Sequence, residues 1–229
     1  MALQQVPTIP ETITVHLGLP NQPAENVTVP FPDYIKNVAS SEIYPTWPEA
    51  AIRANIYAQI TYALNRIFNE FYRSQGYDFD ITSTTQYDQT YIKGRDIYEN
   101  ISRIVDEIFN NYVVRQGRVD PFFTAYCNGT TTVCDGLSQW ETVALAEQGL
   151  TPYQILQKFY GQDIGILEND FGAVNVDMML LKDLEGDQCE LEMVAGGCDA
   201  DCHRRRFKTK LIAMGMCGYD RVIVEPSGI

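Results

Sequence analysis

The sequence predicts an α+β fold, mostly helical with a small mixed sheet, followed by an incomplete α/β segment of the parallel-sheet type. Short stretches of alternating polar and apolar residues open the chain, long apolar stripes at helical spacing fill its middle, and short, continuous apolar runs follow Gly161. The 229 residues, of which 45% are hydrophobic, suffice for one large domain, or for one of about 150 residues with a smaller remnant.

Two strands are expected near the start of the chain. Residues 12–17 (Thr-Ile-Thr-Val-His-Leu) alternate between polar and apolar side chains, which is the period of a strand with one buried face. Residues 26–30 (Asn-Val-Thr-Val-Pro) predict a second strand.

The strongest helix signal lies between Pro45 and Gly76. Thr46-Trp47-Pro48-Glu49 has the pattern of a capping box with a proline in the first turn. The apolar residues that follow recur every three or four positions and should bury most of the helix. They are Ile52, Ile56, Ile60, Ala63, Ile67 and Phe71, with Tyr57, Leu64, Phe68 and Tyr72 beside them.

Helical and strand patterns continue along the chain. A polar loop over 77–90 precedes a predicted helix over 95–115, a short strand over 122–126, a helix over 137–148, and a helix that opens with the capping box Thr151–Gln154 and ends at Gly161. Beyond Gly161, residues 164–167 and 222–224 read as buried strands of a parallel sheet, with a basic helical stretch over 203–214 between them.

Charge and cysteine content limit the classes of partner. The net charge of −13 argues against nucleic acid or an anionic membrane surface. No apolar run is long enough to cross a bilayer, and the first residues do not predict a secretory signal. Six cysteines form two groups, Cys127 and Cys134, and Cys189, Cys198, Cys202 and Cys217, which permit disulfides, free thiols or metal ligands.

A distinctive motif surrounds Glu42. Ser40-Ser41-Glu42-Ile43, Thr46-Trp47-Pro48, Thr61-Tyr62-Ala63-Leu64, Gly136-Leu137-Ser138-Gln139-Trp140 and the segment 146–160 follow one another along the chain. In these motifs and their order, residues 32–161 resemble the glycan-cleaving domain of the stage II sporulation protein D (SpoIID) family. The resemblance implies that the substrate is peptidoglycan and that Glu42 stands where the family keeps its catalytic acid.

The resemblance implies lytic transglycosylase chemistry with a single carboxyl group. Protonated Glu42 would give its proton to the leaving glycosidic oxygen and then, as a carboxylate, take the proton of the muramyl 6-hydroxyl. No second carboxylate and no cofactor is required for that reaction. The apolar neighbours Ile43, Tyr44 and Trp47 should raise the pKa of Glu42. The alternative is a glutamate on a solvated turn.

Substrate contacts are expected from residues around Glu42. Asn55, Gln59, Tyr62 and Arg66 share one helical face and suit hydrogen bonds to sugar hydroxyls and acetamides, while Tyr44 and Trp47 suit stacking on sugar rings, and Ser138 and Gln139 belong to the segment that resembles the family. Alternatively, the polar residues are the polar side of a buried helix and the aromatic residues belong to the core. Asn55 and Ile60 depart from the Gln and Arg usual in the family, which favours a non-catalytic glycan-binding module as the second hypothesis.

Some members of that family hold zinc with Cys and His ligands near the strand that ends at Cys127. Six residues lie between Cys127 and Cys134, which could supply two thiols, but zinc prefers four ligands and no histidine lies close by in the sequence. A local disulfide or two free thiols are the alternatives.

A second resemblance begins after Gly161. Residues 169–177, 196–202 and 220–228 resemble, in order, the central portion of CobW-type metal-chaperone GTPases. Cys198 and Cys202, with Cys189 or His203 as further ligands, would suit zinc. The sequence has no Gly-x-x-x-x-Gly-Lys-Ser/Thr loop and no Asn-Lys-x-Asp motif, so we predict no nucleotide-binding residue and expect no GTP hydrolysis.

The sequence thus predicts two parts, a SpoIID-like peptidoglycan-acting domain over 1–161 and a CobW-like fragment over 162–229. The leading hypothesis is binding and lytic cleavage of peptidoglycan glycan strands. A non-catalytic sporulation or cell-wall module and a metal-binding GTPase remnant are the alternatives. The family implies a place in the bacterial cell envelope or at the spore, while the lack of a visible signal leaves the cytoplasm open.

Overall fold

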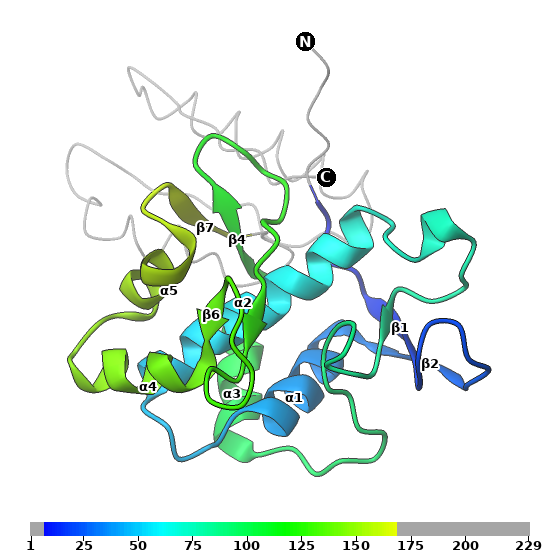
Figure 1. Cartoon of the computed structure of the whole chain (residues 1–229), viewed down its shortest axis with the longest axis horizontal. Coiled ribbons are helices and arrows are strands. Elements are labelled where there is room, and N and C mark those ends of the chain that lie inside the picture. The colour runs from blue at the N-terminus through cyan, green and yellow to red at the C-terminus, as the bar shows by residue number, and fades with distance from the viewer. Residues whose placement is uncertain (1–6, 169–229) are drawn as a thin grey trace, which may run out of the picture. The chain divides into compact units, whose positions relative to one another are not determined.

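The computed structural model describes residues 7–168, which belong to the first of two units into which the chain divides, Met1–Asn169 and Asp170–Ile229. Within the described residues it contains five α-helices and three small sheets (Figure 1), which confirms the α+β class. No helix of this part is long and apolar enough to span a membrane. The strand and helix predicted over 222–224 and 203–214, and the four later cysteines, lie outside the described residues.

Helix α2 (Glu49–Phe68) runs through the middle of this part (Figure 1), as its apolar stripe predicts. Nearly all of its residues from Ala51 to Leu64 are buried. The predicted capping box is wrong, because Pro48 is the N-cap residue and no side chain caps the helix. Trp47 instead closes a turn with the carbonyl of Tyr44 (3.2 Å), and the Glu49 carboxylate pairs with arginines.

The first sheet has the order β2-β1-β3. Strand β1 (Thr12–His16) pairs antiparallel with β2 (Asn26–Pro30), and both strands were predicted. Ile13 and Val15 of β1 point into the core. Strand β3 (Ile81–Thr82) pairs parallel with β1 and lies in the segment that the sequence predicts as a loop. Helix α1 (Phe31–Glu42) follows β2 directly.

The helix predicted over 95–115 is wrong in its second half. Helix α3 (Glu99–Ile108) is followed by strand β4 (Asn111–Arg115). Strand β7 (Ile164–Glu168) pairs with β4 in the antiparallel sense, which contradicts the parallel pairing expected for residues 164–167. Tyr, Val and Val in β4 favour a strand once a partner is present, and that partner comes from about 50 residues further along the chain.

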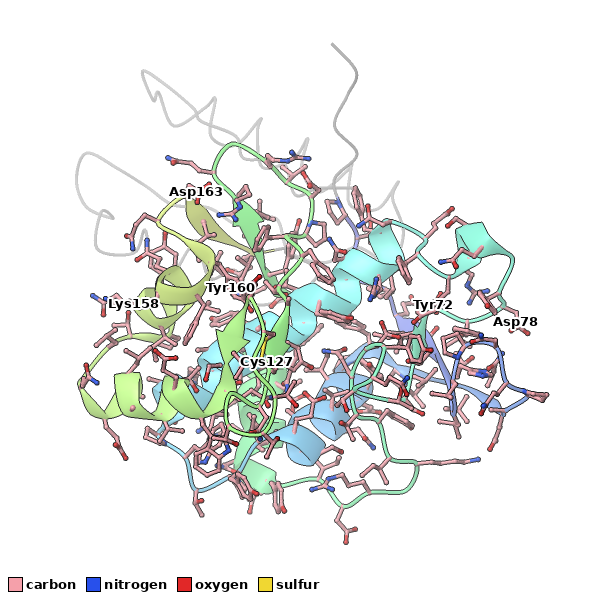
Figure 2. All side chains as sticks on the ribbon, in the orientation of Figure 1. Tyr72, Asp78, Cys127, Lys158, Tyr160 and Asp163 are labelled. Carbon is pink, nitrogen blue, oxygen red and sulfur yellow. A yellow bond between two sulfur atoms is a disulfide. The ribbon has the colours of Figure 1, made fainter. Side chains whose placement is uncertain are left out.

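The remaining elements are two short strands and two helices that pack on α2. Strand β5 (Tyr126–Cys127) shares only Tyr126 with the strand predicted over 122–126, so most of that prediction is wrong. It pairs parallel with β6 (Leu137–Ser138), and a disulfide joins Cys127 to Cys134 (Figure 2). Helices α4 (Gln139–Glu147) and α5 (Pro152–Tyr160) pack on α2. The capping box of α5 is confirmed in full, and Gly161 ends the helix with a positive φ of 94°.

Candidate functional site: a buried carboxyl at the end of α1

The last residue of α1, Glu42, holds its carboxyl group against three hydrogen-bond donors from distant parts of the chain. Oε1 accepts from the backbone N–H of Thr90 (2.7 Å). Oε2 accepts from the Tyr126 hydroxyl (2.7 Å) and from Nε2 of Gln59 (2.9 Å). Because Oε2 already accepts two bonds and Oε1 only one, Oε1 has the free lone pair on which a transferable proton can sit.

A buried glutamine fixes the direction of the bond from Tyr126. Nε2 of Gln89 donates to the Tyr126 oxygen (2.9 Å) and to the carbonyl of Gln59 (3.1 Å), while its Oε1 accepts from the hydroxyl of Tyr34 (3.0 Å). Since an amide nitrogen only donates, the single proton of the Tyr126 hydroxyl is directed at Glu42.

The surroundings favour the protonated form of Glu42. Burial raises the pKa of this carboxyl above its usual value, and the hydrogen bonds from Thr90, Tyr126 and Gln59 lower it only in part. Burial, together with nearby carboxylates, also raises the pKa of Tyr34 and of Tyr126 well above the usual range. Both tyrosines therefore keep their protons at neutral pH. A carboxyl with a raised pKa and fixed donors is suited to general acid and base chemistry.

The 83–98 loop brings Thr90 and Gln89 to the site, and α1 holds one side of it. The Asn37 side chain donates to the carbonyl of Ile92 (2.8 Å) and accepts from its N–H (2.9 Å). The N–H of Tyr98 donates to the Ser40 hydroxyl (3.3 Å). Helix α1 therefore carries both the carboxyl and part of the support for its donors.

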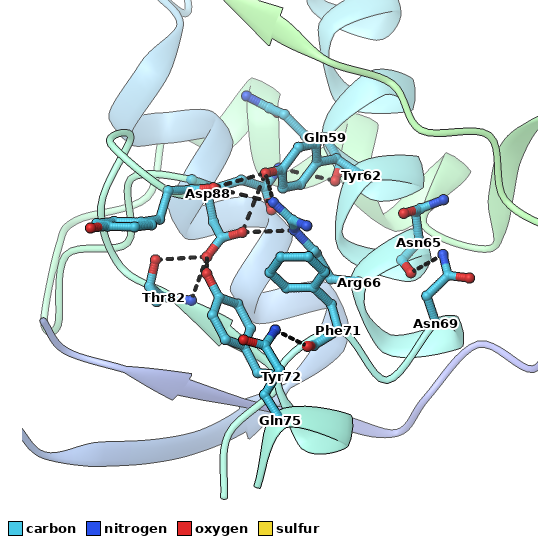
Figure 3. Close-up of polar contacts among 12 residues, drawn as sticks. Gln59, Tyr62, Asn65, Arg66, Asn69, Phe71, Tyr72, Gln75, Thr82 and Asp88 are labelled. Atoms are coloured by element: carbon cyan, nitrogen blue, oxygen red, sulfur yellow. Dashed lines mark hydrogen bonds and ion pairs between the residues drawn. The ribbon is translucent and has the colours of Figure 1, made fainter. Parts of the chain in front are cut away.

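Asp88 holds the other side of the loop, and its side chain is fully buried. Figure 3 shows hydroxyl, guanidinium and backbone groups converging on its carboxylate. Oδ2 accepts from the Tyr72 hydroxyl (2.6 Å) and from the hydroxyl and N–H of Thr82 (2.7 and 3.0 Å). Oδ1 accepts from Nε of Arg66 (2.8 Å) and from the Tyr62 hydroxyl (3.2 Å). These bonds join the loop to α2 and β3, so Asp88 anchors the segment that supplies Thr90.

The predicted substrate-contact residues occupy different places. Gln59 contacts Glu42, and its Oε1 is buried without a hydrogen bond within residues 7–168. Tyr62, like Arg66, belongs to the Asp88 cluster. Asn55 is buried between helices, where Nδ2 donates to Thr142 of α4 (2.8 Å). Ser138 caps α4, with its hydroxyl accepting from the N–H of Glu141 (3.4 Å).

Gln139, also a predicted contact, is 5% exposed, and its Nε2 makes no hydrogen bond within the described part of the chain. Its carbonyl accepts from the Thr142 hydroxyl (2.6 Å). The first turn of α4 is thereby fixed beside Asn55, one helical turn before Gln59 on α2.

Tyr44 and Trp47, the predicted stacking residues, form one aromatic cluster with Trp140. Ring centroids are 5.7 Å apart for Tyr44 and Trp47, 5.7 Å for Tyr44 and Trp140, and 4.9 Å for Trp47 and Trp140. Trp47 is 9% exposed, whereas Tyr44 is 55% and Trp140 40% exposed. Trp47 is therefore core, and the other two rings face solvent.

The cysteine pair near this site forms a bond rather than a metal site. Cys127 and Cys134 are joined as a disulfide, one of the alternatives that the sequence left open. No group of three or more His, Cys, Asp or Glu side chains within residues 7–168 is placed to hold a metal ion. The zinc ligands proposed at Cys189, Cys198, Cys202 and His203 lie outside this part.

Several residues of the site are not predicted from the sequence. Thr90 acts through its backbone, for which no side-chain pattern exists. Gln89 and Asp88 lie in a segment whose sequence predicts only a polar loop and no particular site residue. Tyr126 ends the strand predicted over 122–126, and a tyrosine in a short strand has no distinguishing signal of its own.

The site thus belongs to the class built around one buried, hydrogen-bonded carboxyl on an α+β scaffold. Comparison with known proteins gives two family matches. Residues 22–113 match SpoIID, the stage II sporulation protein family, and residues 153–229 match the CobW/HypB/UreG nucleotide-binding domain family. The two-part resemblance inferred from the sequence is confirmed. The first match covers Glu42, Gln59 and Thr90, and the second begins inside α5.

One curated relative is an uncharacterized protein of Brachyspira hyodysenteriae. It is 32% identical over 100 residues, which are 43% of this chain and 26% of that protein. The chain therefore spans about a quarter of the length of this relative.

Proposed function

We propose that the SpoIID-like part of the chain binds peptidoglycan glycan strands and cleaves them as a lytic transglycosylase, with Glu42 as the single acid and base. The observation that carries the proposal is the Glu42 carboxyl, whose pKa is raised by burial and whose oxygens meet Thr90, Tyr126 and Gln59. The SpoIID match supports a role in the cell wall or in sporulation, and we propose the cell envelope as the location.

In the proposed reaction the proton leaves Oε1 of Glu42 for the glycosidic oxygen as the bond from that oxygen to the muramyl C1 breaks. The carboxylate then accepts the proton of the muramyl 6-hydroxyl, whose oxygen forms a new bond to C1. The products are a 1,6-anhydromuramyl end and a free hydroxyl on the leaving sugar, and Glu42 regains its proton. Water is not consumed. The donors on Oε2 and Oε1 stabilise the carboxylate between the two steps.

The test is incubation of the purified chain with glycan strands that lack stem peptides, followed by mass spectrometry of the products. Anhydromuramyl ends are expected from the wild type. Glu42→Gln should lower the rate by at least about 100-fold, because general acid and base catalysis contributes that much or more. Glu99→Gln, an equal charge change at an exposed position on α3, is the matched control and should cleave normally.

Two outcomes would contradict parts of the proposal. Equal rates for Glu42→Gln and wild type would remove Glu42 from the chemistry. Binding of strands without any product would favour the non-catalytic module, a reading supported by Asn55, which is engaged with Thr142 in helix packing.

The match of residues 153–229 to a nucleotide-binding family favours a second, separate proposal for the end of the chain. On sequence alone, Cys198 and Cys202, with Cys189 or His203, suit zinc. The zinc content of the purified chain should fall in Cys198→Ser and Cys202→Ser variants, and an unchanged stoichiometry would rule this site out.

A further inference from the structure

Two large aromatic rings, Tyr44 and Trp140, remain open to solvent over the buried ring of Trp47. The three rings contact one another in tilted and edge-on arrangements at centroid distances of 4.9 to 5.7 Å. Backbone hydrogen bonds fix the main chain at both exposed residues. The carbonyl of Tyr44 accepts from the N–H of Trp47 (3.2 Å), and the N–H of Trp140 donates to the carbonyl of Asn128 (3.3 Å). We call Tyr44 and Trp140 the aromatic patch.

Both residues of the patch are linked to the surroundings of Glu42. Tyr44 is the second residue after Glu42 at the end of α1. Trp140 directly follows Gln139, in the turn of α4 that Thr142 fixes beside α2. Asn55, which contacts Thr142, lies one helical turn before Gln59 on α2, and the side chain of Gln59 donates to Glu42.

The charges near the patch disfavour an anionic ligand. Glu49 and Glu141 are close neighbours of its residues in the sequence. Arg53 and Arg103 pair with Glu49, and both also pair with Glu107. A neutral ligand with a flat apolar face remains suited to the two rings. The face of an aromatic ring carries negative charge density, which attracts the partly positive C–H groups on one face of a pyranose.

We propose that the aromatic patch is a stacking subsite for a sugar ring of the glycan strand, next to the Glu42 site and outside the bond that Glu42 cleaves. The identity of the ligand rests on the proposed function. Such a subsite adds affinity only for strands long enough to fill both places. It therefore makes binding depend on strand length and favours long strands over disaccharides.

The test uses the full chain with Glu42→Gln, which prevents cleavage, titrated with neutral β-1,4-linked N-acetylglucosamine oligomers of two to six rings. Trp47 and Trp140 are the two tryptophans of the whole sequence, so tryptophan emission reports on this cluster. The emission should change on binding, and the affinity measured by calorimetry should rise with oligomer length. Adding Trp140→Ala should weaken binding of the six-ring oligomer by about tenfold and leave that of the two-ring oligomer unchanged.

Two further variants separate stacking from folding defects. Tyr44→Ala, which removes a mostly exposed ring, should reproduce the length-dependent loss. Phe68→Ala removes an exposed ring at the C-terminal end of α2, about 20 Å along the helix from Asn55, which contacts the first turn of α4, and should bind like the parent.

The subsite is overturned if Trp140→Ala and Tyr44→Ala bind the six-ring oligomer as tightly as the parent, or if they weaken all lengths equally. It is also overturned if sedimentation shows a dimer that Trp140→Ala dissociates, because the patch is then a contact between two copies. The proposed function fails separately. If binding depends on length but the wild type forms no anhydromuramyl products, the proposed cleavage is wrong and the subsite stands. If products form with a KM that Trp140→Ala does not alter, the subsite alone is wrong.

Discussion

Thr90 donates its backbone N–H to Oε1 of Glu42 at 2.7 Å, although 48 residues separate the two in the sequence. The loop that carries Thr90 is fixed on one side by Asp88 and on the other by the pairing of Asn37 with Ile92. The geometry of the carboxyl therefore depends on residues that do not touch it.

Asp88→Asn should destabilise the fold and weaken the site together. The substitution removes the negative charge that faces Arg66 and sets an amide against the donors of Thr82 and Tyr72. Removing one partner of a buried ion pair costs about 3 kcal/mol or more. Chemical denaturation should show that loss in the free energy of unfolding, and cleavage should slow because the loop no longer holds Thr90.

The matched control is Asp96→Asn, the same change at an exposed position of the same loop. Its free energy of unfolding should stay within about 0.5 kcal/mol of the wild type. If Asp88→Asn were as stable as Asp96→Asn, the cluster around Asp88 would not be the anchor of the loop.

Tyr126→Phe should raise the pKa of Glu42 further. The hydroxyl of Tyr126 stabilises the carboxylate, so its loss favours the protonated form. The limb of the pH profile on which cleavage falls with rising pH should move to higher pH, and an NMR titration of the Glu42 carboxyl should move with it. Tyr112→Phe, which removes a hydroxyl bonded to the Val119 carbonyl, is the control and should leave both titrations in place. A downward shift in Tyr126→Phe would contradict the assigned direction of the hydrogen bond.

The raised pKa of Glu42 also predicts a pH-dependent penalty on stability. Below the ordinary value of about 4.5, the carboxyl is protonated in both the folded and the unfolded chain. As the pH rises above that value, the unfolded chain releases its proton first, so the folded chain holds more protons and loses stability. The loss is complete once the pH exceeds the pKa of the folded chain.

Glu42→Gln lacks this titration, so the unfolding free energy of the wild type minus that of the variant should fall as the pH rises above about 4.5. All other ionisable groups are common to the two proteins and cancel in the difference. Denaturation curves at a series of pH values measure it. A difference that grows with pH would show that the hydrogen bonds outweigh burial and that the pKa of Glu42 is lowered.

The features that can be predicted from the sequence are those that depend on residues close together in the chain. The apolar stripe of α2 and the Thr151–Gln154 capping box of α5 are local patterns. The structure confirms the capping box, and it confirms the stripe as far as Leu64, whereas Phe71 lies beyond the end of α2 and is 40% exposed. The helix predicted over 95–115 includes the residues of strand β4, and only pairing with β7 decides between the two states.

The site divides in the same way. The motif around Glu42 singles out the carboxyl, and the helical face of α2 includes Gln59, which donates to it. Thr90 and Tyr126 reach the carboxyl over 48 and 84 residues of sequence, respectively. Contacts over such distances in the sequence arise from tertiary packing, so neither hydrophobic periodicity nor a capping motif predicts them.

The disulfide between Cys127 and Cys134 offers a last test, because its loop supports both Tyr126 at the Glu42 site and Trp140 of the aromatic patch. Cys127 follows Tyr126, which donates to Glu42, and the carbonyl of Asn128 accepts from the N–H of Trp140. Within the closed loop, Oδ1 of Asn128 also accepts from the N–H groups of Thr130 and Thr131, at 3.1 and 3.2 Å. Opening the bond should loosen the support of both Tyr126 and the aromatic patch.

Replacing both cysteines by serine should lower the free energy of unfolding by about 2 kcal/mol, the value expected for a short closed loop of this kind. A reductant should move the denaturation midpoint of the wild type toward that of the double variant. The double variant in the same reductant is the control, since it reports any effect of the four later cysteines. Tryptophan emission of the native protein should change with the loss of the bond. If the midpoints of wild type and double variant coincide without reductant, the loop is held by Asn128 and its hydrogen bonds alone.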